Sequence, residues 1–350
     1  MNPYVLTILI SSLGLGTVLT FASSHWLLAW MGLEINTLAI IPIMAQQHHP
    51  RAIEATTKYF LTQATAAAMI LFASTTNAWL MGEWEIHQLS HPLATTTAML
   101  ALALKLGLAP VHFWLPEVLQ GLELTTGLIL STWQKLAPFA LMIQVAPSID
   151  SSLLIAIGLM STLVGGWGGL NQTQLRKILA YSSIAHLGWM VLILQFAPSL
   201  TLLSLSLYII MTSSAFLTLK TNNSLTINAL ATSWTKSPTL AALTALVLLS
   251  LGGLPPLSGF MPKWLILQEL TKQELPLIAT LAAMTALLSL YFYLRLCYAL
   301  TLTIYPNTLT ATAPWRLNFT MFTLPLSIVT ILALGLLPLT PAVSAMLTLW

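Results

Sequence analysis

The sequence predicts an all-α polytopic membrane protein, and three observations support this fold class. Of the 350 residues, 57% are hydrophobic and only 6% are charged, whereas about 25% of the residues of an ordinary soluble domain are charged. The mean hydropathy is +0.85. Apolar stretches of roughly 20 residues, long enough to cross a hydrocarbon core, recur from one end of the chain to the other. Lipid, rather than water, is therefore the expected main solvent.

Polar, proline and glycine clusters divide the first half of the chain into five apolar runs, each of which is predicted to span the membrane as a helix. The amino terminus lacks both a charged region with a cleavage site and the Arg-rich amphipathic pattern of a transit peptide, so the first run is expected to be retained. The expected limits are 3–22, 25–45, 56–80, 93–120 and 124–146.

The second half divides in the same way into five further runs, and a final run follows a more polar stretch. Their expected limits are 151–170, 176–195, 199–219, 238–271, 276–300 and 322–346. The sequence therefore predicts about eleven transmembrane helices.

Two of the predicted helices contain interruptions. The fourth includes Lys105-Leu-Gly-Leu-Ala-Pro110-Val-His112, and the ninth includes a run from Leu251 to Lys263 with three glycines and three prolines. Prolines delete helix hydrogen bonds and glycines relax the backbone. Broken helices at membrane depth persist only where protein or a wet cavity satisfies the freed carbonyl groups.

The two interruptions occupy corresponding positions. The fourth helix is the fourth of the first five, and the ninth helix is the fourth of the next five. Such paired interruptions indicate an internal repeat, and an odd number of helices in each copy makes the copies inverted. We expect one membrane domain, with a five-helix repeat at 1–147, a second at 148–300, and a loop with a last helix at 301–350. This alignment loosely pairs Lys105 with Lys263, and Glu34 with His186.

The basic residues in the loops and near the ends of the predicted helices are distributed unevenly, and an excess of Lys and Arg marks the cytoplasm-equivalent side. An odd number of helices places the two termini on opposite sides. Only Lys272 falls on the side that holds the carboxyl terminus. The other side holds the amino terminus and eight basic residues: Arg51, Lys58, Arg176, Lys177, Lys220, Lys236, Arg295 and Arg316.

Glu34, Lys105 and Lys135 are ionisable groups within otherwise apolar helices. Such groups are costly at membrane depth and usually face a polar path for protons or ions. Burial disfavours the charged form of a lysine and a nearby carboxylate favours it, so movement of Glu34 relative to a lysine would load or release a proton. The alternatives are a protonated Glu34 bonded between helices, an inert ion pair at Lys105, and a snorkelling Lys135.

Lys263 follows the second interruption, where it could end a proton path or hold loose carbonyl groups at a helix end. His112 and His186 could bridge between the lysines, because imidazole titrates near neutral pH, or could be buried groups that are simply hydrogen-bonded. The single cysteine, Cys297, excludes a disulfide framework and a cysteine-ligated cluster within this chain. Scattered basic residues argue against a nucleic-acid partner.

Three motifs resemble the chain 2 family of NADH-ubiquinone oxidoreductase, the mitochondrial respiratory complex I, in its vertebrate form. They are LKLGLAPVHFWLPEV from Leu104, AYSSIAHLGW from Ala180 and GGLPPLSGFMPKW from Gly252. The resemblance implies an antiporter-like subunit of the complex I membrane arm, with Glu34, Lys105, Lys135 and Lys263 at proton-relay positions.

The resemblance further implies proton transfer from the matrix to Lys105 and Lys135, then past His112 or His186 to Lys263, coupled to quinone reduction elsewhere. Flavin, iron-sulfur clusters and the ubiquinone site are expected on other subunits, with no redox chemistry, cofactor or metal on this chain. The expected partners are the lipid bilayer, a second antiporter-like subunit and small hydrophobic subunits in the mitochondrial inner membrane. The amino terminus would face the matrix and the carboxyl terminus the intermembrane space. A stand-alone cation/proton antiporter and a non-pumping scaffold are the alternatives.

Overall fold

The computed structural model describes residues 2–46, 48–235, 237–302 and 323–347. The topology charges Lys236 and Arg316 lie outside these residues. Within them the regular structure is helical, without strands and with two isolated β-bridges, which confirms the all-α prediction. The chain divides into two compact units, Met1–Met160 and Ser161–Trp350, and each is described by itself.

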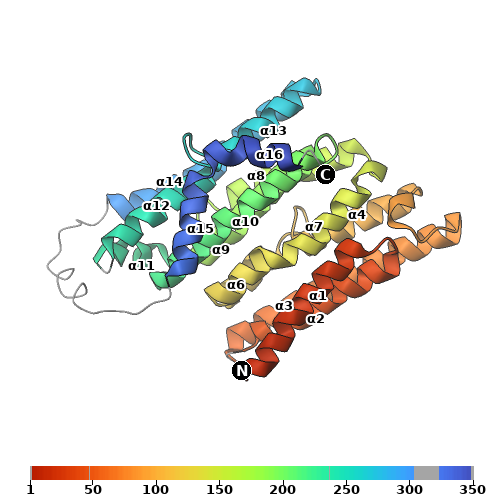
Figure 1. Cartoon of the computed structure of the whole chain (residues 1–350), viewed down its shortest axis with the longest axis horizontal. Helices are drawn as coiled ribbons and strands as arrows, with labels where there is room; N and C mark the ends of the chain where they lie inside the picture. Colours follow the sequence, from red (N-terminus) through yellow and green to blue (C-terminus); the bar gives the residue numbers. More distant parts are fainter. Residues whose placement is uncertain (1, 47, 236, 303–322, 348–350) are drawn as a thin grey trace. The chain divides into compact units, whose positions relative to one another are not determined.

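The first unit is built from long helices that pack side by side. Helix α1 packs along α2, and α3 contacts α2, α4 and α5 (Figure 1). Helix α8, Ser151–Gly168, crosses the boundary between the units. The other helices of this unit are α1 (Pro3–Ala22), α2 (Trp26–Met44), α3 (Pro50–Met81), α4 (Pro92–Leu106), α5 (Trp114–Gly121), α6 (Leu124–Ser131) and α7 (Trp133–Val145).

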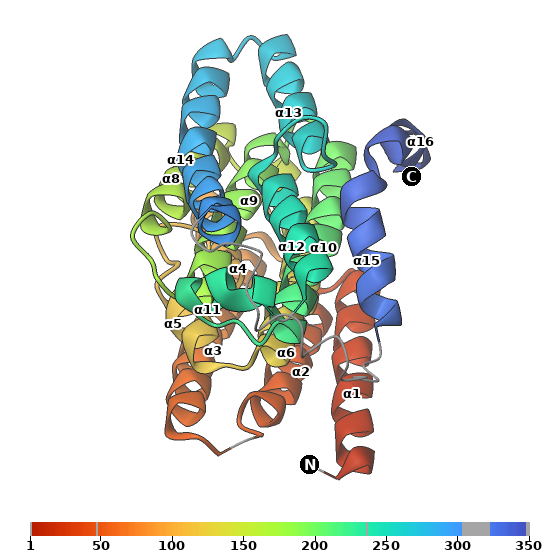
Figure 2. The same cartoon turned by 90° about the vertical axis from the view of Figure 1, so that its left-hand side faces the viewer.

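In the second unit, α12 packs against α10 and α14, and a short turn joins α13 to α14, which lies beside it (Figure 2). Helix α15 also contacts α10. The helices of this unit are α9 (Leu175–Ile193), α10 (Pro198–Thr221), α11 (Ile227–Ala231), α12 (Pro238–Gly252), α13 (Phe260–Lys272), α14 (Pro276–Thr301), α15 (Leu324–Gly335) and α16 (Thr340–Leu347).

Seven helical segments of the described residues are long and apolar enough to cross a membrane, namely α1, α2, α3, α8, α10, α14 and the segment Leu124–Ser148, which contains α6 and α7. The protein is therefore polytopic, as predicted, although the count of eleven is not confirmed. The last predicted helix, 322–346, is not straight, because its two halves are bent by 66° at a break. Pro338 and Pro341 lie at this break and remove backbone donors from the helix.

The fifth predicted helix, 124–146, is also interrupted, at Thr132 between α6 and α7. The carbonyl oxygen of Leu128 accepts hydrogen bonds from the Ser131 hydroxyl at 3.1 Å, the Thr132 hydroxyl at 2.7 Å and the Thr132 amide at 3.0 Å. Side-chain bonds of this kind bend helices. Pro138, six residues further on within α7, also lacks an amide donor.

The two predicted interruptions are present and have the same backbone geometry. Helices α4 and α12 both contain 15 residues, and both end at a glycine in the left-handed conformation, Gly107 and Gly253, each with φ +78°. Each break contains a cis peptide bond before a proline, Pro110 or Pro256. Counted from the two glycines, Leu251 takes the place of Lys105.

Two further features of the first unit have a counterpart in the second. Helices α2 and α9 both contain 19 residues. The residue before each forms a β-bridge to a later loop, His25 to Glu85 and Gln174 to Thr226. In this register Ser183 takes the place of Glu34.

The predicted pairs of Lys105 with Lys263 and of Glu34 with His186 are therefore out of register, because helix order alone does not define register within corresponding helices. Counted from Gly107 and Gly253, Glu117 takes the place of Lys263. The repeat boundaries and their inversion stay predictions.

Substitution of Gly107 by alanine is expected to destabilise the protein by about 2–4 kcal/mol. The left-handed backbone conformation is unfavourable for alanine. In addition, the alanine Cβ would lie 2.9 Å from Cδ1 of Leu115. Gly82 has φ +79° with nothing within 4 Å of such a Cβ, so Gly82→Ala isolates the backbone contribution. Thermal unfolding in detergent should show the larger loss for Gly107→Ala, and equal losses would contradict the packing contribution.

Candidate functional site: a polar cavity in the first unit

The first unit encloses a small cavity between six helices, α2 to α7. Its volume open to the centre of a water molecule is about 20 Å³, and roughly 10–15 Å³ is enough to hold one water. Both deep lysines of this unit reach it. The lining residues are Leu33, Asn36, Thr37, Tyr59, Gln63, Lys105, Leu106, Trp114, Leu115, Leu130, Gln134, Lys135 and Pro138.

Lys105 approaches the cavity from the last turn of α4, just before the break. Its residue is only 5% exposed, and its Nζ has no hydrogen-bond partner among the residues that the structure describes. The indole of Trp114, the first residue of α5, donates a hydrogen bond to the carbonyl oxygen of Leu104 at 2.9 Å. This hydrogen bond holds α5 against the end of α4, next to Lys105.

Lys135 reaches the same cavity from the first turn of α7, directly after the interruption at Thr132. It is 3% exposed. The neighbouring Gln134 donates a side-chain hydrogen bond to the backbone carbonyl of Asn36 at 3.3 Å, which ties α7 to α2. The unpredicted interruption thus determines where Lys135 sits.

Glu34 lies in the middle of α2 and is partly exposed rather than buried. Its carboxylate accepts a hydrogen bond from the hydroxyl of Thr37 at 3.1 Å, and Thr37 lines the cavity. Glu34 itself is not one of the lining residues, and Nζ of Lys105 has no hydrogen-bond partner among the described residues. The structure therefore brings Glu34, Lys105 and Lys135 to one region of the first unit.

Two residues of the cavity were missed by the sequence analysis. Asn36 in α2 and Gln63 in α3 are 2% and 4% exposed, and both line the cavity beside the lysines. Their signal in the sequence is an amide in the middle of an apolar helix. An amide is uncharged, so it is far less conspicuous there than a lysine or a glutamate.

His112 lies in the break between α4 and α5 and does not line the cavity. It is 4% exposed, and its Nδ1 lies 3.3 Å from the carbonyl oxygen of Pro110. Its ring packs against Phe113 with a centroid distance of 4.4 Å. These contacts place His112 next to the backbone break that supports Lys105.

Lys263 and His186 belong to the second unit. Lys263 lies in the first turn of α13, and its Nζ donates a hydrogen bond to the carbonyl oxygen of Gly252, the last residue of α12, at 2.8 Å. This bond fits the alternative in which a cation holds a helix-end carbonyl group. The ring of His186 in α9 lies 5.7 Å from that of Tyr208 in α10, centroid to centroid.

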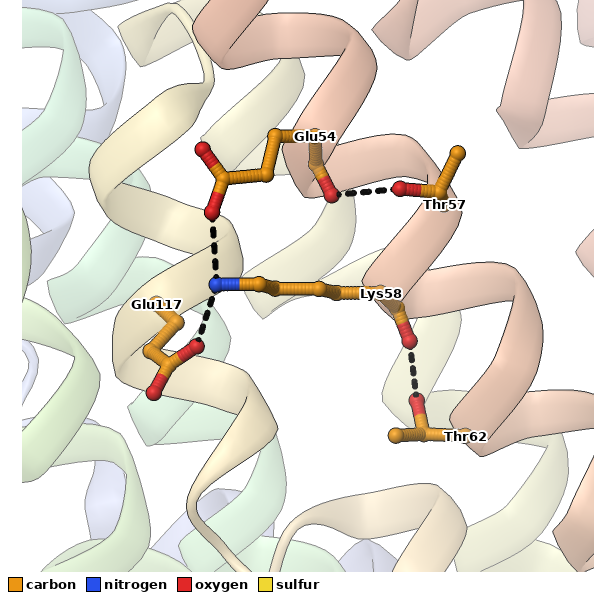
Figure 3. Close-up of polar contacts among 5 residues, drawn as sticks. All are labelled: Glu54, Thr57, Lys58, Thr62 and Glu117. Carbon is orange, nitrogen blue, oxygen red and sulfur yellow. Dashed lines mark hydrogen bonds and ion pairs between the residues drawn. The ribbon is translucent and has the colours of Figure 1, made fainter.

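An exposed ion-pair cluster joins α3 to α5 in the first unit. Nζ of Lys58 lies 2.8 Å from a carboxylate oxygen of Glu54 and 2.8 Å from one of Glu117 (Figure 3). The three side chains are 41%, 63% and 54% exposed, respectively. Exposed pairs of this kind contribute little, because solvent screens them and ordering the side chains costs entropy.

Replacement of Lys58 by methionine is therefore expected to lower the unfolding temperature only slightly, by less than Gly107→Ala does. Added salt should shrink the difference, because it screens the exposed charges. Thermal unfolding in detergent at low and high ionic strength measures both effects. A large loss that does not depend on salt would show that Lys58 acts through packing instead.

No group of three or more His, Cys, Asp or Glu side chains that could hold a metal ion occurs within the described part of the chain. The polar side chains that line the cavity carry ammonium, amide and hydroxyl groups. Such groups exchange protons and hydrogen bonds.

Comparison with known proteins identifies the family. Residues 23–289 match the family described as "NADH:quinone oxidoreductase/Mrp antiporter, TM", and residues 290–344 match "NADH dehydrogenase subunit 2 C-terminus". The chain is 95% identical over 349 residues to NADH-ubiquinone oxidoreductase chain 2 of Oncorhynchus mykiss, with 100% of both chains covered.

Solved structures of complex I and of an Mrp complex contain chains with the same fold. A chain of respiratory complex I from Thermus thermophilus is 30% identical with a TM-score of 0.86, over 99% of this chain and 81% of that one. A chain of the Mrp complex from Dietzia shares the fold at 17% identity with a TM-score of 0.80, over 97% and 77%. The chain belongs to the family of NADH-ubiquinone oxidoreductase chain 2, within the NADH:quinone oxidoreductase/Mrp antiporter group.

Proposed function

We propose that this chain is the antiporter-like subunit of a respiratory NADH:ubiquinone oxidoreductase in which the Lys105–Lys135 cavity takes up and passes on protons. The observation that carries the proposal is the meeting of two buried lysines in one polar cavity of a chain from this family. Two buried lysines that line one small cavity of a membrane protein would be costly if both had to stay charged. Their proximity is useful if a proton moves between them.

Glu34 is the proposed control element of this site. Nζ of Lys105 has no hydrogen-bond partner among the described residues, so a shift of α2 that moved the Glu34 carboxylate toward or away from it would change how readily Lys105 holds a proton. Thr37 holds the carboxylate through its hydroxyl and lines the cavity, which links any movement of Glu34 to the cavity wall. Redox energy released elsewhere in the enzyme would act through such a shift.

His112, His186 and Lys263 are the proposed continuation of the proton path. Lys263 would hold its proton while bonded to the carbonyl oxygen of Gly252, and loss of that proton would weaken its grip on the end of α12. This combines its two candidate roles, since the group that carries the proton is also the group that holds the helix end.

The proposed setting is the membrane arm of the enzyme in the mitochondrial inner membrane, with the amino terminus in the matrix and the carboxyl terminus in the intermembrane space. Its proposed neighbours are a second antiporter-like subunit and small hydrophobic subunits. Flavin, iron-sulfur clusters and the ubiquinone site belong to other subunits in this proposal, so this chain contributes proton transfer and no redox chemistry.

The test is Glu34→Gln in the intact enzyme, reconstituted in liposomes. Glutamine keeps the shape of the side chain and its bond to Thr37 but removes the charge that acts on Lys105. We expect proton translocation coupled to NADH oxidation to fall by about tenfold, the equivalent of one unit in proton affinity.

Unchanged translocation would favour the non-pumping scaffold. Purified chain in liposomes without the other subunits provides the second arm, and cation/proton exchange by the chain alone would favour a stand-alone antiporter. We expect no exchange in that arm.

A further inference from the structure

Two side-chain amides face the same cavity as the two lysines. Neither Nδ2 nor Oδ1 of Asn36, nor Nε2 of Gln63, has a hydrogen-bond partner among the described residues, and the same holds for Nζ of Lys105. Exchange of the nitrogen and oxygen of Asn36 would not change this result, because both atoms are unpaired. Four helices, α2, α3, α4 and α7, thus each contribute at least one polar side chain to the lining of one small space.

Buried polar atoms without partners are unusual, because the hydrogen bonds they make with water in the unfolded chain are lost. A polar cavity with several such atoms and enough room for a water molecule is where ordered water is expected. We propose that Asn36 and Gln63 are positioning residues that hold water against Lys105 and Lys135, so that a proton can pass between the lysines. This inference rests on the proposed function.

The proton step conserves the water molecule. An N–H bond of one ammonium group breaks as an O–H bond forms to the water oxygen, and the opposite O–H bond of the water breaks as an N–H bond forms at the other lysine. The net result is the movement of one proton. The amides take no proton themselves, and their contribution is to fix the water oxygen and the direction of its hydrogens.

A purely structural role for Asn36 does not fit the second unit. There, Ala185 takes its place and Leu251 takes the place of Lys105. A Cβ on Gly165 would meet the backbone and Cβ of Ala185, whereas a Cβ on Gly16 would meet the amide of Asn36. A close approach of the two helices therefore forms with an alanine at this position, and the amide is present in the unit that also has the lysine.

The matching experiment replaces Asn36 by alanine in the intact enzyme in liposomes, and the rates of NADH oxidation and proton translocation are measured together. We expect translocation per NADH oxidised to fall by roughly fivefold to tenfold. This is the effect of losing one hydrogen bond to the water molecule that contacts the charged lysine. Gln63→Met, which keeps the length of the side chain, should act in the same direction. Asn36→Ser, whose hydroxyl can bond a water, should restore most of the loss.

Asn77→Ala is the matched control, because Asn77 is a fully buried amide of α3 whose Nδ2 donates to the carbonyl oxygens of Glu83 and Gln88 at 3.2 and 3.3 Å. It should lower the amount of stable enzyme but leave the protons translocated per NADH unchanged. Failure of Asn36→Ser to restore translocation, or an equal loss in Asn77→Ala, would overturn the positioning role.

Lys105→Met in the same assay distinguishes failure of the positioning role of the amides from failure of the proposed function. If Lys105→Met lowers translocation and Asn36→Ala does not, the positioning role of the amides is wrong and the proposed function stands. If Lys105→Met itself leaves translocation unchanged, the proposed function fails, and this inference fails with it.

Discussion

Replacement of Lys135 by methionine is expected to lower coupled proton translocation by roughly 10²-fold, the smaller end of what a positioned proton donor or acceptor contributes. Methionine matches the unbranched shape of lysine, so the buried site at the start of α7 should keep its packing. What disappears is the titratable nitrogen on one side of the cavity. The measurement is dye-monitored acidification of liposomes that contain the intact enzyme, with NADH as the electron donor.

Lys272→Met is the control for this substitution, because Lys272 lies at the end of α13 with a side chain that is 61% exposed and pairs only with the nearby Glu269 at 3.3 Å. It should leave translocation unchanged. Equal translocation by the Lys135→Met and unaltered enzymes, at equal rates of NADH oxidation, would remove Lys135 from the proton path.

Replacement of Gly259 by alanine is expected to cause the largest loss of stability of any single methyl group considered, about 3 kcal/mol or more, at or beyond the upper end of ordinary overpacking. Gly259 is the residue before α13, and its Cβ would overlap the backbone carbonyl of Ser250 in α12 and lie 3.0 Å from Sδ of Met211 in α10. A backbone carbonyl cannot rotate away as a side chain can. Helix α13 would have to move, and Lys263 with it.

Thermal unfolding of the purified enzyme in detergent, together with the yield of assembled enzyme, measures this effect. Gly335→Ala is a suitable control, because Gly335 ends α15 and a Cβ there would meet nothing within 4 Å. Alanine has the higher helix propensity, so the control should be neutral or slightly stabilising. A Gly259→Ala enzyme as stable as the control would mean that the break between α12 and α13 can relax without cost.

Hydropathy predicted the limits of several helices closely but placed the start of α3 at residue 56, six residues after its observed start at Pro50. It predicted interruptions only where glycine and proline crowd together. Helices α1, α2 and α9 match the predicted limits within one or two residues, because polar clusters bound each of them. The interruption at Thr132 was missed because it depends on hydroxyl groups that compete for one carbonyl oxygen, which is a matter of geometry rather than composition.

The candidate site followed from the sequence as far as charge reveals it. Lys105 and Lys135 stand out in apolar helices, and the structure places both at one cavity. Asn36 and Gln63 carry no charge and were overlooked, although their amides face the same space. Which of these groups meet depends on helix rotation and on the interruptions, which hydropathy does not determine.

The glycine-capped breaks after α4 and α12 share one backbone conformation but have different side chains at matching positions. Leu251 stands where the first unit has Lys105, and the first unit has Glu117 where the second has Lys263. The same backbone break thus forms with an ionisable or an apolar residue two positions before its glycine. Chemical roles within such a protein can therefore be reassigned between halves by single substitutions, without redesign of the backbone.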